Sequence, residues 1–287
     1  TIHVLPKSSN FGADKKPYYM NLFRFTIMKK LFTALLFLCA CISTASAKNA
    51  NDSIRVLFIG NSYTYFNNLP DDVQKIAESQ RLKLSYRASL KGGFSFERHL
   101  KDKETIAKIK EGNWDYVILQ EQSEAPAKPT HMVAEDTYLY AHTLDSLVHA
   151  YSPKAHVVFY MTWGHKYGCQ TPVPNYPLID SYTGMQERLK TSYLEMTYAN
   201  GAWCAPVGMA WQQVRRERPD YVLYAQDSTH PSPLGTYLAA NVIFSAIHQK
   251  PYQTAYTKGL QAEQAEYIQQ TAQNMVLNNL RLLNITK

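Results

Sequence analysis

Two widely separated segments of this sequence carry the side chains needed for acyl transfer. Asp227 and His230 lie together in the segment Asp-Ser-Thr-His-Pro, and Ser62 follows Gly60 and Asn61 far upstream. A serine hydroxyl becomes a strong nucleophile only when a neighbouring base removes its proton. Histidine can accept and return that proton near neutral pH, and a carboxylate can orient the imidazole. The two segments therefore predict a nucleophile, a base and an orienting acid, provided that the fold brings them together.

The first 47 residues have the pattern of a targeting segment. Lys29 and Lys30 precede an apolar run over 31–42, and the small residues Ala45 and Ala47 follow it. A basic start, a short apolar run and a small-x-small site are typical of a secretory signal peptide, and the run is short for a membrane span. We expect residues 28–47 to be a signal peptide that is cleaved after Ala47. The mature protein is then expected to be secreted or periplasmic.

Two further expectations concern this end of the chain. Met28, or alternatively Met20, is the expected start of translation, so that residues 1–27 are expected to be an upstream extension, either non-native or untranslated. The alternative to a cleaved secretory signal is a lipoprotein signal in which Cys41 carries the lipid.

The charge of the chain is concentrated in this same segment. Of the 30 Lys and Arg and the 23 Asp and Glu residues, six and one respectively lie within the first 47 residues, which leaves 24 and 22. The remainder is therefore almost neutral. A nearly neutral domain does not favour nucleic acid or an anionic membrane as a partner.

Short apolar runs alternate with helical patterns from residue 48 to residue 287. We expect one domain there, a flavodoxin-like three-layer α/β sandwich with a five-stranded parallel sheet in the order 2-1-3-4-5. The expected strands cover 55–60, 82–88, 116–120, 155–162 and 202–207. The expected helices cover 69–80, a stretch towards 110, 133–150, 185–199, 233–248 and 262–283, and a Gly-, Pro- and Tyr-rich loop covers 164–182.

This topology predicts where polar residues meet. Ser62 follows the first strand, Gly93 lies a few residues past the second, and Gln120 and Gln122 stand at the end of the third. These strands are neighbours in the expected order, and ligands of such sheets bind beyond the carboxyl ends of the strands. The loop of His230 precedes a helix and can lie at the same edge. The sequence therefore predicts one site at this edge.

The order of these segments resembles the conserved blocks of SGNH (GDSL-type) hydrolases, over residues 52–250. The matching segments are Gly60-Asn61-Ser62, Gly92-Gly93-Phe94-Ser95, the polar end of the third strand and Asp227-x-x-His230-Pro231, of which the last is the most specific. The resemblance implies a flavodoxin-like sheet and ester hydrolysis through a serine nucleophile. The family includes many secreted carbohydrate acetylesterases.

The resemblance also implies a role for each residue. Ser62 corresponds to the nucleophile, His230 to the general base and Asp227 to the orienting carboxylate. The backbone N–H groups of Ser62 and Gly93 are the natural oxyanion donors. Asn61 replaces the more familiar aspartate of the first block.

The third block departs more strongly from the family pattern. Gln120-Glu121-Gln122-Ser123 replaces the usual Gly-x-Asn-Asp, whose asparagine supplies a third oxyanion donor. Strand alternation places both glutamines on one face, so either could provide the amide. We favour Gln122 and keep Gln120 as the alternative.

Other residues carry weaker predictions. The rings of Tyr63, Phe94 and Trp163 are expected near the strand ends, where they could stack on a sugar. Cys169 and Cys204 form either one disulfide or two unpaired thiols. We expect no metal site and no cofactor.

The resulting prediction is a secreted serine esterase. Its expected substrate is a small-molecule or glycan ester, most specifically an O-acetylated carbohydrate. The alternatives are a lipase, thioesterase or acyltransferase with the same triad, and a non-catalytic glycan-binding module on the same scaffold.

Overall fold

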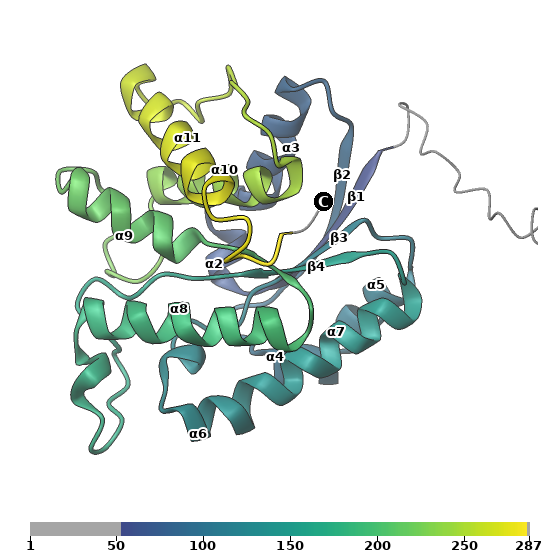
Figure 1. The fold of residues 1–287 in the computed structure, drawn as a ribbon, viewed down its shortest axis with the longest axis vertical. Helices are drawn as coiled ribbons and strands as arrows, with labels where there is room; N and C mark the ends of the chain where they lie inside the picture. Colours follow the sequence, from purple (N-terminus) through teal and green to yellow (C-terminus); the bar gives the residue numbers. More distant parts are fainter. Residues whose placement is uncertain (1–52, 286–287) are drawn as a thin grey trace, which may run out of the picture. The chain divides into compact units, whose positions relative to one another are not determined.

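Five short parallel strands form one sheet in the order β2-β1-β3-β4-β5 (Figure 1). The computed structural model describes residues 53–285. Each of the three central strands contains an apolar run that is almost completely buried, over 56–59, 117–119 and 157–160. Such runs are typical of parallel strands covered on both faces. The strands are β1 (Ile54–Gly60), β2 (Leu84–Leu90), β3 (Tyr116–Leu119), β4 (His156–Tyr160) and β5 (Trp203–Ala205).

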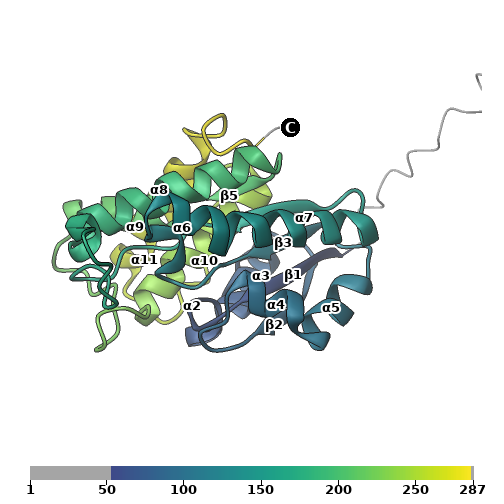
Figure 2. The same ribbon diagram turned by 90° about the horizontal axis from the view of Figure 1, so that it is seen from below.

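Helices cover both faces of this sheet. α3 and α10 lie on one face, with α11 packed on α10, whereas α4, α5, α7 and α8 lie on the other (Figures 1 and 2). The crossover from β1 to β2 runs in the opposite direction to the three that follow, so right-handed crossovers place α3 on the opposite face from α5, α7 and α8. The longer helices are α3 (Leu69–Ser79), α5 (Lys103–Lys110), α7 (Leu139–Tyr151), α8 (Tyr182–Ala199), α9 (Val207–Glu217), α10 (Pro233–His248) and α11 (Ala262–Leu277). The shorter ones are α2 (Ser62–Tyr65), η1 (Phe66–Asn68), α4 (Phe96–Lys101), η2 (Ala125–Ala127), α6 (Thr130–Val133), η3 (Ala134–Tyr138) and η4 (Pro177–Asp180).

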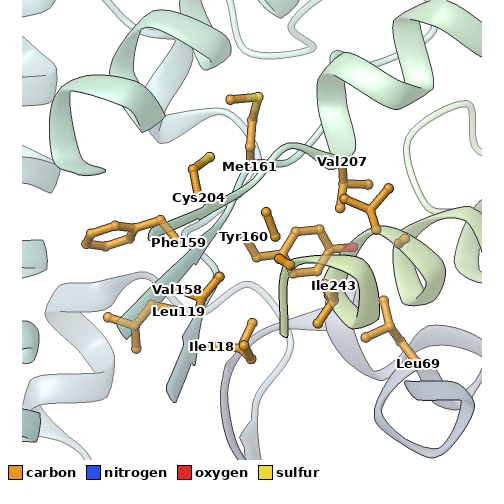
Figure 3. Close-up of a cluster of buried hydrophobic side chains, with 14 of the residues drawn as sticks. Leu69, Ile118, Leu119, Val158, Phe159, Tyr160, Met161, Cys204, Val207 and Ile243 are labelled. Atoms are coloured by element: carbon orange, nitrogen blue, oxygen red, sulfur yellow. The ribbon is translucent and has the colours of Figure 1, made fainter. Parts of the chain in front are cut away.

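The core consists of two apolar layers, one on each side of the sheet. Phe159 and Tyr160 are successive residues of β4 and point to opposite faces (Figure 3). Tyr160 lies on the side of Ile243 from α10, and all three side chains are fully buried. Burial of each such side chain contributes about 1.5–3 kcal/mol to stability.

The two cysteines of the described residues, Cys169 and Cys204, are unpaired. Cys204 lies in β5, inside the apolar cluster of Figure 3, whereas Cys169 is half-buried in the loop after β4. Burial raises the pKa of each thiol to about 12. The sequence left open a disulfide between these two cysteines or two unpaired thiols, and the structure has the unpaired thiols.

The strand order and the α/β class predicted from the sequence are confirmed. Several expected bounds differ from the observed ones: the helix expected over 133–150 is divided among α6, η3 and α7, and the helix expected from 185 begins at Tyr182. β2 begins two residues later and extends to Leu90, β5 is limited to Trp203–Ala205, and α11 ends at Leu277. The helix α9 (Val207–Glu217) was not predicted.

Several predictions lie outside the described residues. These are the extension over 1–27, the signal peptide over 28–47, its cleavage after Ala47, the alternative lipidation of Cys41 and the start of the domain at residue 48. Within residues 53–285, no helix combines the length and the apolar character needed to cross a membrane.

A buried ion pair anchors the connection between α10 and α11 to α3. Asp72 is 1% exposed, and one of its carboxylate oxygens lies 2.7 Å from Lys258 Nζ. Tyr256 donates its hydroxyl to the same carboxylate at 2.6 Å. Lys258 Nζ also donates to the Asn67 carbonyl at 2.6 Å, close to the end of η1. Burial raises the pKa of Asp72, although the hydrogen bonds from Lys258 and Tyr256 oppose this.

We expect Lys258→Met to destabilise the protein by about 3 kcal/mol, because it leaves a buried carboxylate without its cation. The free energy of unfolding in urea measures this. Lys75→Met is the matched control, since it breaks the exposed pair of Lys75 with Asp71 and should shift the midpoint little. Equal midpoints for both variants would contradict the buried role of Lys258.

Candidate active site

Three side chains form a continuous hydrogen-bonded chain beyond the carboxyl end of β1. Ser62 Oγ lies 2.8 Å from His230 Nε2. His230 Nδ1 lies 2.5 Å from Asp227 Oδ2. The structure therefore brings together the three residues that the sequence placed in two separate segments. In such a chain the imidazole can take a proton from the serine while its other nitrogen donates to the carboxylate.

Ser62 is presented by a tight turn from strand to helix. Asn61 is the N-cap of α2, and its Oδ1 accepts a hydrogen bond from the Tyr63 N–H at 3.1 Å. The amide Nδ2 of Asn61 donates to the Phe94 carbonyl at 2.9 Å, which connects this turn to the one after β2. Ser62 is thus the first residue of a helix, where its own N–H has no intrahelical acceptor.

The side-chain amide of Gln120 hydrogen-bonds to this turn. Its Oε1 accepts from the Asn61 N–H at 2.9 Å and from Thr64 Oγ1 at 2.8 Å. Its Nε2 donates to Asn61 Oδ1 at 2.9 Å and to the Glu121 carbonyl. Gly60 permits this contact, because a Cβ there would lie 2.7 Å from Gln120 Oε1. Gln120 is completely buried, and its amide is fully used within the protein.

The Asp227–His230 loop is shaped by its own carboxylate. Asp227 Oδ1 accepts from the N–H groups of Thr229 at 3.0 Å and His230 at 2.9 Å. Ser228, between them, adopts a left-handed backbone with φ of 67°. Burial alone would raise the pKa of Asp227, but these N–H groups and the imidazole lower it to about 2. The carboxylate therefore stays ionised beside His230.

Asn67 joins the nucleophile side of the site to the histidine loop. Its Nδ2 donates to the Pro231 carbonyl at 3.0 Å and to Thr236 Oγ1 at 2.9 Å. Asn67 and Asn68 both have positive φ, of 54° and 59°, a conformation that asparagine tolerates better than most residues. The chain thereby turns sharply between η1 and α3.

Aromatic rings hold the imidazole of His230. Phe66 stacks on it with ring centroids 4.2 Å apart, and Tyr63 meets it edge-on at 5.3 Å. Tyr63 in turn stacks on Trp163 at 4.7 Å. The Trp163 indole also donates to the Thr229 carbonyl at 3.0 Å. These contacts limit rotation of the histidine ring.

The expected sugar contacts of two aromatic residues need correction. Tyr63 is 2% exposed and Trp163 is fully buried, because they stack on each other beneath the histidine loop. Neither ring is exposed enough for a sugar to stack on its face, although Tyr63 contributes to the wall of the cavity described below. Phe94 is half-buried, and Lys91 and Arg98 lie over its ring.

Ser62 and Gly93 line one cavity, and their backbone N–H groups are candidate donors to a ligand. Among the described residues, neither the Ser62 N–H nor the Gly93 N–H has a hydrogen-bond acceptor. Gly93 is exposed and has φ of 68°, and a Cβ there would project into open space. Glycine suits both the left-handed backbone and the approach of a ligand.

Gln122 differs from Gln120 in how its amide is used. Its Oε1 accepts from the N–H groups of Glu124 and Ala125 at 2.8 and 2.9 Å. Its Nε2 makes a long contact of 3.5 Å with Ser123 Oγ, and the residue lines the same cavity as Ser62. Gln122, and not the buried Gln120, can therefore offer a donor to a ligand.

This cavity has a volume of about 380 Å³ and a polar lining. Among the described residues that line it, none is Leu, Ile, Val, Met or Phe. It is lined by Asn61, Ser62, Tyr63, Gly93, Gln122, Ser123, Glu124, His165, Gln170, Thr171, Thr229 and His230. A nucleophile, a base and free N–H donors at one cavity are the equipment for acyl transfer.

Glu121 is a structural carboxyl group that the sequence analysis did not identify. It is completely buried, and its side chain accepts from the N–H groups of Phe96 at 3.1 Å and Gln122 at 2.5 Å. It thus ties the start of α4 to the end of β3. Burial raises its pKa to about 8, although these two N–H groups lower it. Because Glu121 lies between two glutamines, no alternation of polar and apolar residues in the sequence indicated that its side chain is buried.

Glu124 and His165 are two further residues of the cavity that sequence reasoning missed. Both are almost fully buried, yet both line the cavity that contains Ser62. Glu124 follows the polar end of β3, and His165 lies in the long loop after β4. In the sequence, the only indication of a role for Glu124 or His165 was that each is a polar residue shortly after the end of a strand.

Comparison with known proteins gives matches among solved structures. A protein from Slackia heliotrinireducens, assigned to the SGNH hydrolases, is 31% identical, with 67% of this chain and 98% of that chain covered and a TM-score of 0.54. A DUF4886 family protein from Bacteroides uniformis is 18% identical, with 79% and 95% covered and a TM-score of 0.61. An acetyl xylan esterase from Geobacillus stearothermophilus is 15% identical, with 70% and 97% covered and a TM-score of 0.50. No family model and no curated protein matches the chain.

We expect Glu121→Gln to become more stable relative to the wild type as the pH rises from 5 to 8. Over most of this range the folded wild type keeps the Glu121 proton and the unfolded chain releases it, so wild-type stability falls with pH, by up to roughly 1.4 kcal/mol per unit. Glutamine cannot ionise and escapes this loss. Urea unfolding of both proteins at several pH values measures the difference.

The control for this experiment is Glu97→Gln. Hydrogen bonding to Lys101 lowers the pKa of the exposed Glu97, which places its titration below the pH range used. Its difference from the wild type should stay nearly constant from pH 5 to 8. A constant difference for Glu121→Gln as well would refute the assigned burial effect.

Proposed function

The chain belongs to the SGNH hydrolase superfamily, and on that premise we propose that it is a serine esterase with Ser62, His230 and Asp227 as its catalytic residues. The observation that carries this proposal is the hydrogen-bonded chain from Ser62 Oγ through His230 to Asp227. Ser62 and Gly93 line the same cavity, and among the described residues their N–H groups have no acceptor, which supports the same chemistry.

In the proposed reaction, Ser62 Oγ attacks the ester carbonyl while His230 Nε2 takes the serine proton. The N–H groups of Ser62 and Gly93, with Gln122 Nε2, stabilise the oxyanion of the tetrahedral intermediate. Collapse of this intermediate expels the alcohol, which receives the proton from His230. Water, activated by His230, then attacks the acyl-enzyme, releases the acid and restores Ser62. Asp227 stabilises the imidazolium at both stages.

We propose an O-acetylated carbohydrate as the substrate. The polar lining of the cavity supports a small acyl group and a hydroxyl-rich alcohol, because a long acyl chain needs an apolar wall. The fold likeness to an acetyl xylan esterase is in keeping with this choice. Secretion, expected from residues 28–47, would bring the enzyme to extracellular glycans.

We expect Ser62→Ala to lower kcat for p-nitrophenyl acetate by at least about 10³-fold, because it removes the hydroxyl that is hydrogen-bonded to His230 Nε2. Ser85→Ala, in an exposed position on β2, is the matched control and should retain wild-type turnover. Urea unfolding checks that both variants are folded. Equal kcat values for Ser62→Ala and the wild type would contradict the catalytic proposal and favour a glycan-binding module.

A second experiment should distinguish the role of Gln122 in catalysis from the role of Gln120 in stability. Gln122→Glu retains the carbonyl-type oxygen that holds Glu124 and Ala125 but removes the amide donor, so kcat should fall on the order of 10²-fold with stability largely kept. Gln120→Ala should instead lower the free energy of unfolding by about 1–3 kcal/mol, because buried groups lose their partners. Full activity of a folded Gln122→Glu protein would rule out Gln122 as an oxyanion donor.

A further inference from the structure

A buried histidine without a hydrogen-bond partner lies in the wall of the active-site cavity. His165 is 4% exposed and lines the same cavity as Ser62 and His230. Among the described residues, neither of its ring nitrogens makes a hydrogen bond. A buried polar group left unpaired costs about 1–3 kcal/mol, so such groups in a native structure call for an explanation.

The neighbour of His165 is a carboxylate that is itself held firmly. His165 Nδ1 lies 3.5 Å from Glu124 Oε1. The same oxygen accepts from the N–H groups of Gln170 at 2.5 Å and Thr171 at 3.2 Å. Glu124 is therefore fixed by the loop that follows β4. It favours the imidazole tautomer with the proton on Nδ1, which leaves Nε2 as an acceptor.

The charge state of His165 suits a neutral ligand. Burial lowers its pKa, and nearby His230 acts in the same direction, although Glu124 and Asp227 raise it. A neutral imidazole can exchange hydrogen bonds with a hydroxyl group, which both donates and accepts. The surrounding Gln122, Gln170 and Thr171 add polar groups to this part of the cavity.

We propose that His165, oriented by Glu124, is a specificity-determining residue that binds a free hydroxyl group of the carbohydrate part of the substrate. This inference rests on the proposed esterase function and adds the group that is recognised. The substrate hydroxyl would donate to Nε2 and satisfy a buried acceptor. An ester whose alcohol part carries no free hydroxyl leaves that acceptor unpaired. Sites built to bind a hydroxyl discriminate strongly against such analogues.

The test compares two esters that differ in this group. The probes are a monoacetylated methyl xyloside, which has free hydroxyls, and p-nitrophenyl acetate, which has none. For each variant, kcat and KM are measured with both esters. The kcat/KM for the xyloside is then divided by the kcat/KM for p-nitrophenyl acetate, and this ratio is compared with that of the wild type. His165→Phe should lower this ratio at least tenfold, chiefly through a higher KM for the xyloside.

Two further variants make the result specific. His165→Gln retains a donor and an acceptor and should recover part of the ratio, and it serves if His165→Phe does not fold. His131→Phe replaces an exposed histidine of α6 and should keep the wild-type ratio. An equal loss on both esters, or an unchanged ratio, for folded His165 variants would overturn the hydroxyl-binding role. Hydrolysis of neither ester by the wild type would instead overturn the proposed esterase function.

Discussion

The geometry of the site depends on the buried amide of Gln120. One side chain at the end of β3 holds the Asn61 N–H, the Asn61 amide oxygen and the Thr64 hydroxyl, and so fixes the turn that presents Ser62. This is possible because Gly60 has no side chain at the point of contact. Asn61 then extends the connection to the Phe94 carbonyl after β2. Three neighbouring strand ends are thus joined by two amide side chains.

The histidine side of the site is held by different forces. Asp227 shapes its own loop through two backbone N–H groups, and aromatic rings contact the imidazole from two directions. Tyr63 of α2 stacks on Trp163, which stacks in turn on Trp211 of α9 with ring centroids 4.0 Å apart. Polar contacts therefore position Ser62, whereas stacked rings mainly position His230. Asn67 connects the two sides.

Much of this arrangement could be predicted from the sequence, because strand order alone determines which strand ends are neighbours. The choice between Gln120 and Gln122 could not. Alternation places both on one face only while the strand continues, and β3 ends at Leu119. Beyond that point the chain turns, so that one amide is buried and the other lines the cavity. The burial of Tyr63 and Trp163 likewise depends on contacts between distant segments, which no local pattern records.

The spacing of the site along the chain has a consequence for biosynthesis. Ser62 and His230 are 168 residues apart and come from the first strand and from the loop before α10. A partly synthesised or proteolytically clipped chain that ends before Asp227 contains Ser62 but neither His230 nor Asp227. Its hydroxyl is then no more reactive than that of any other serine. The hydrogen-bonded set of Ser62, His230 and Asp227 can therefore form only after almost the whole domain has been made and folded.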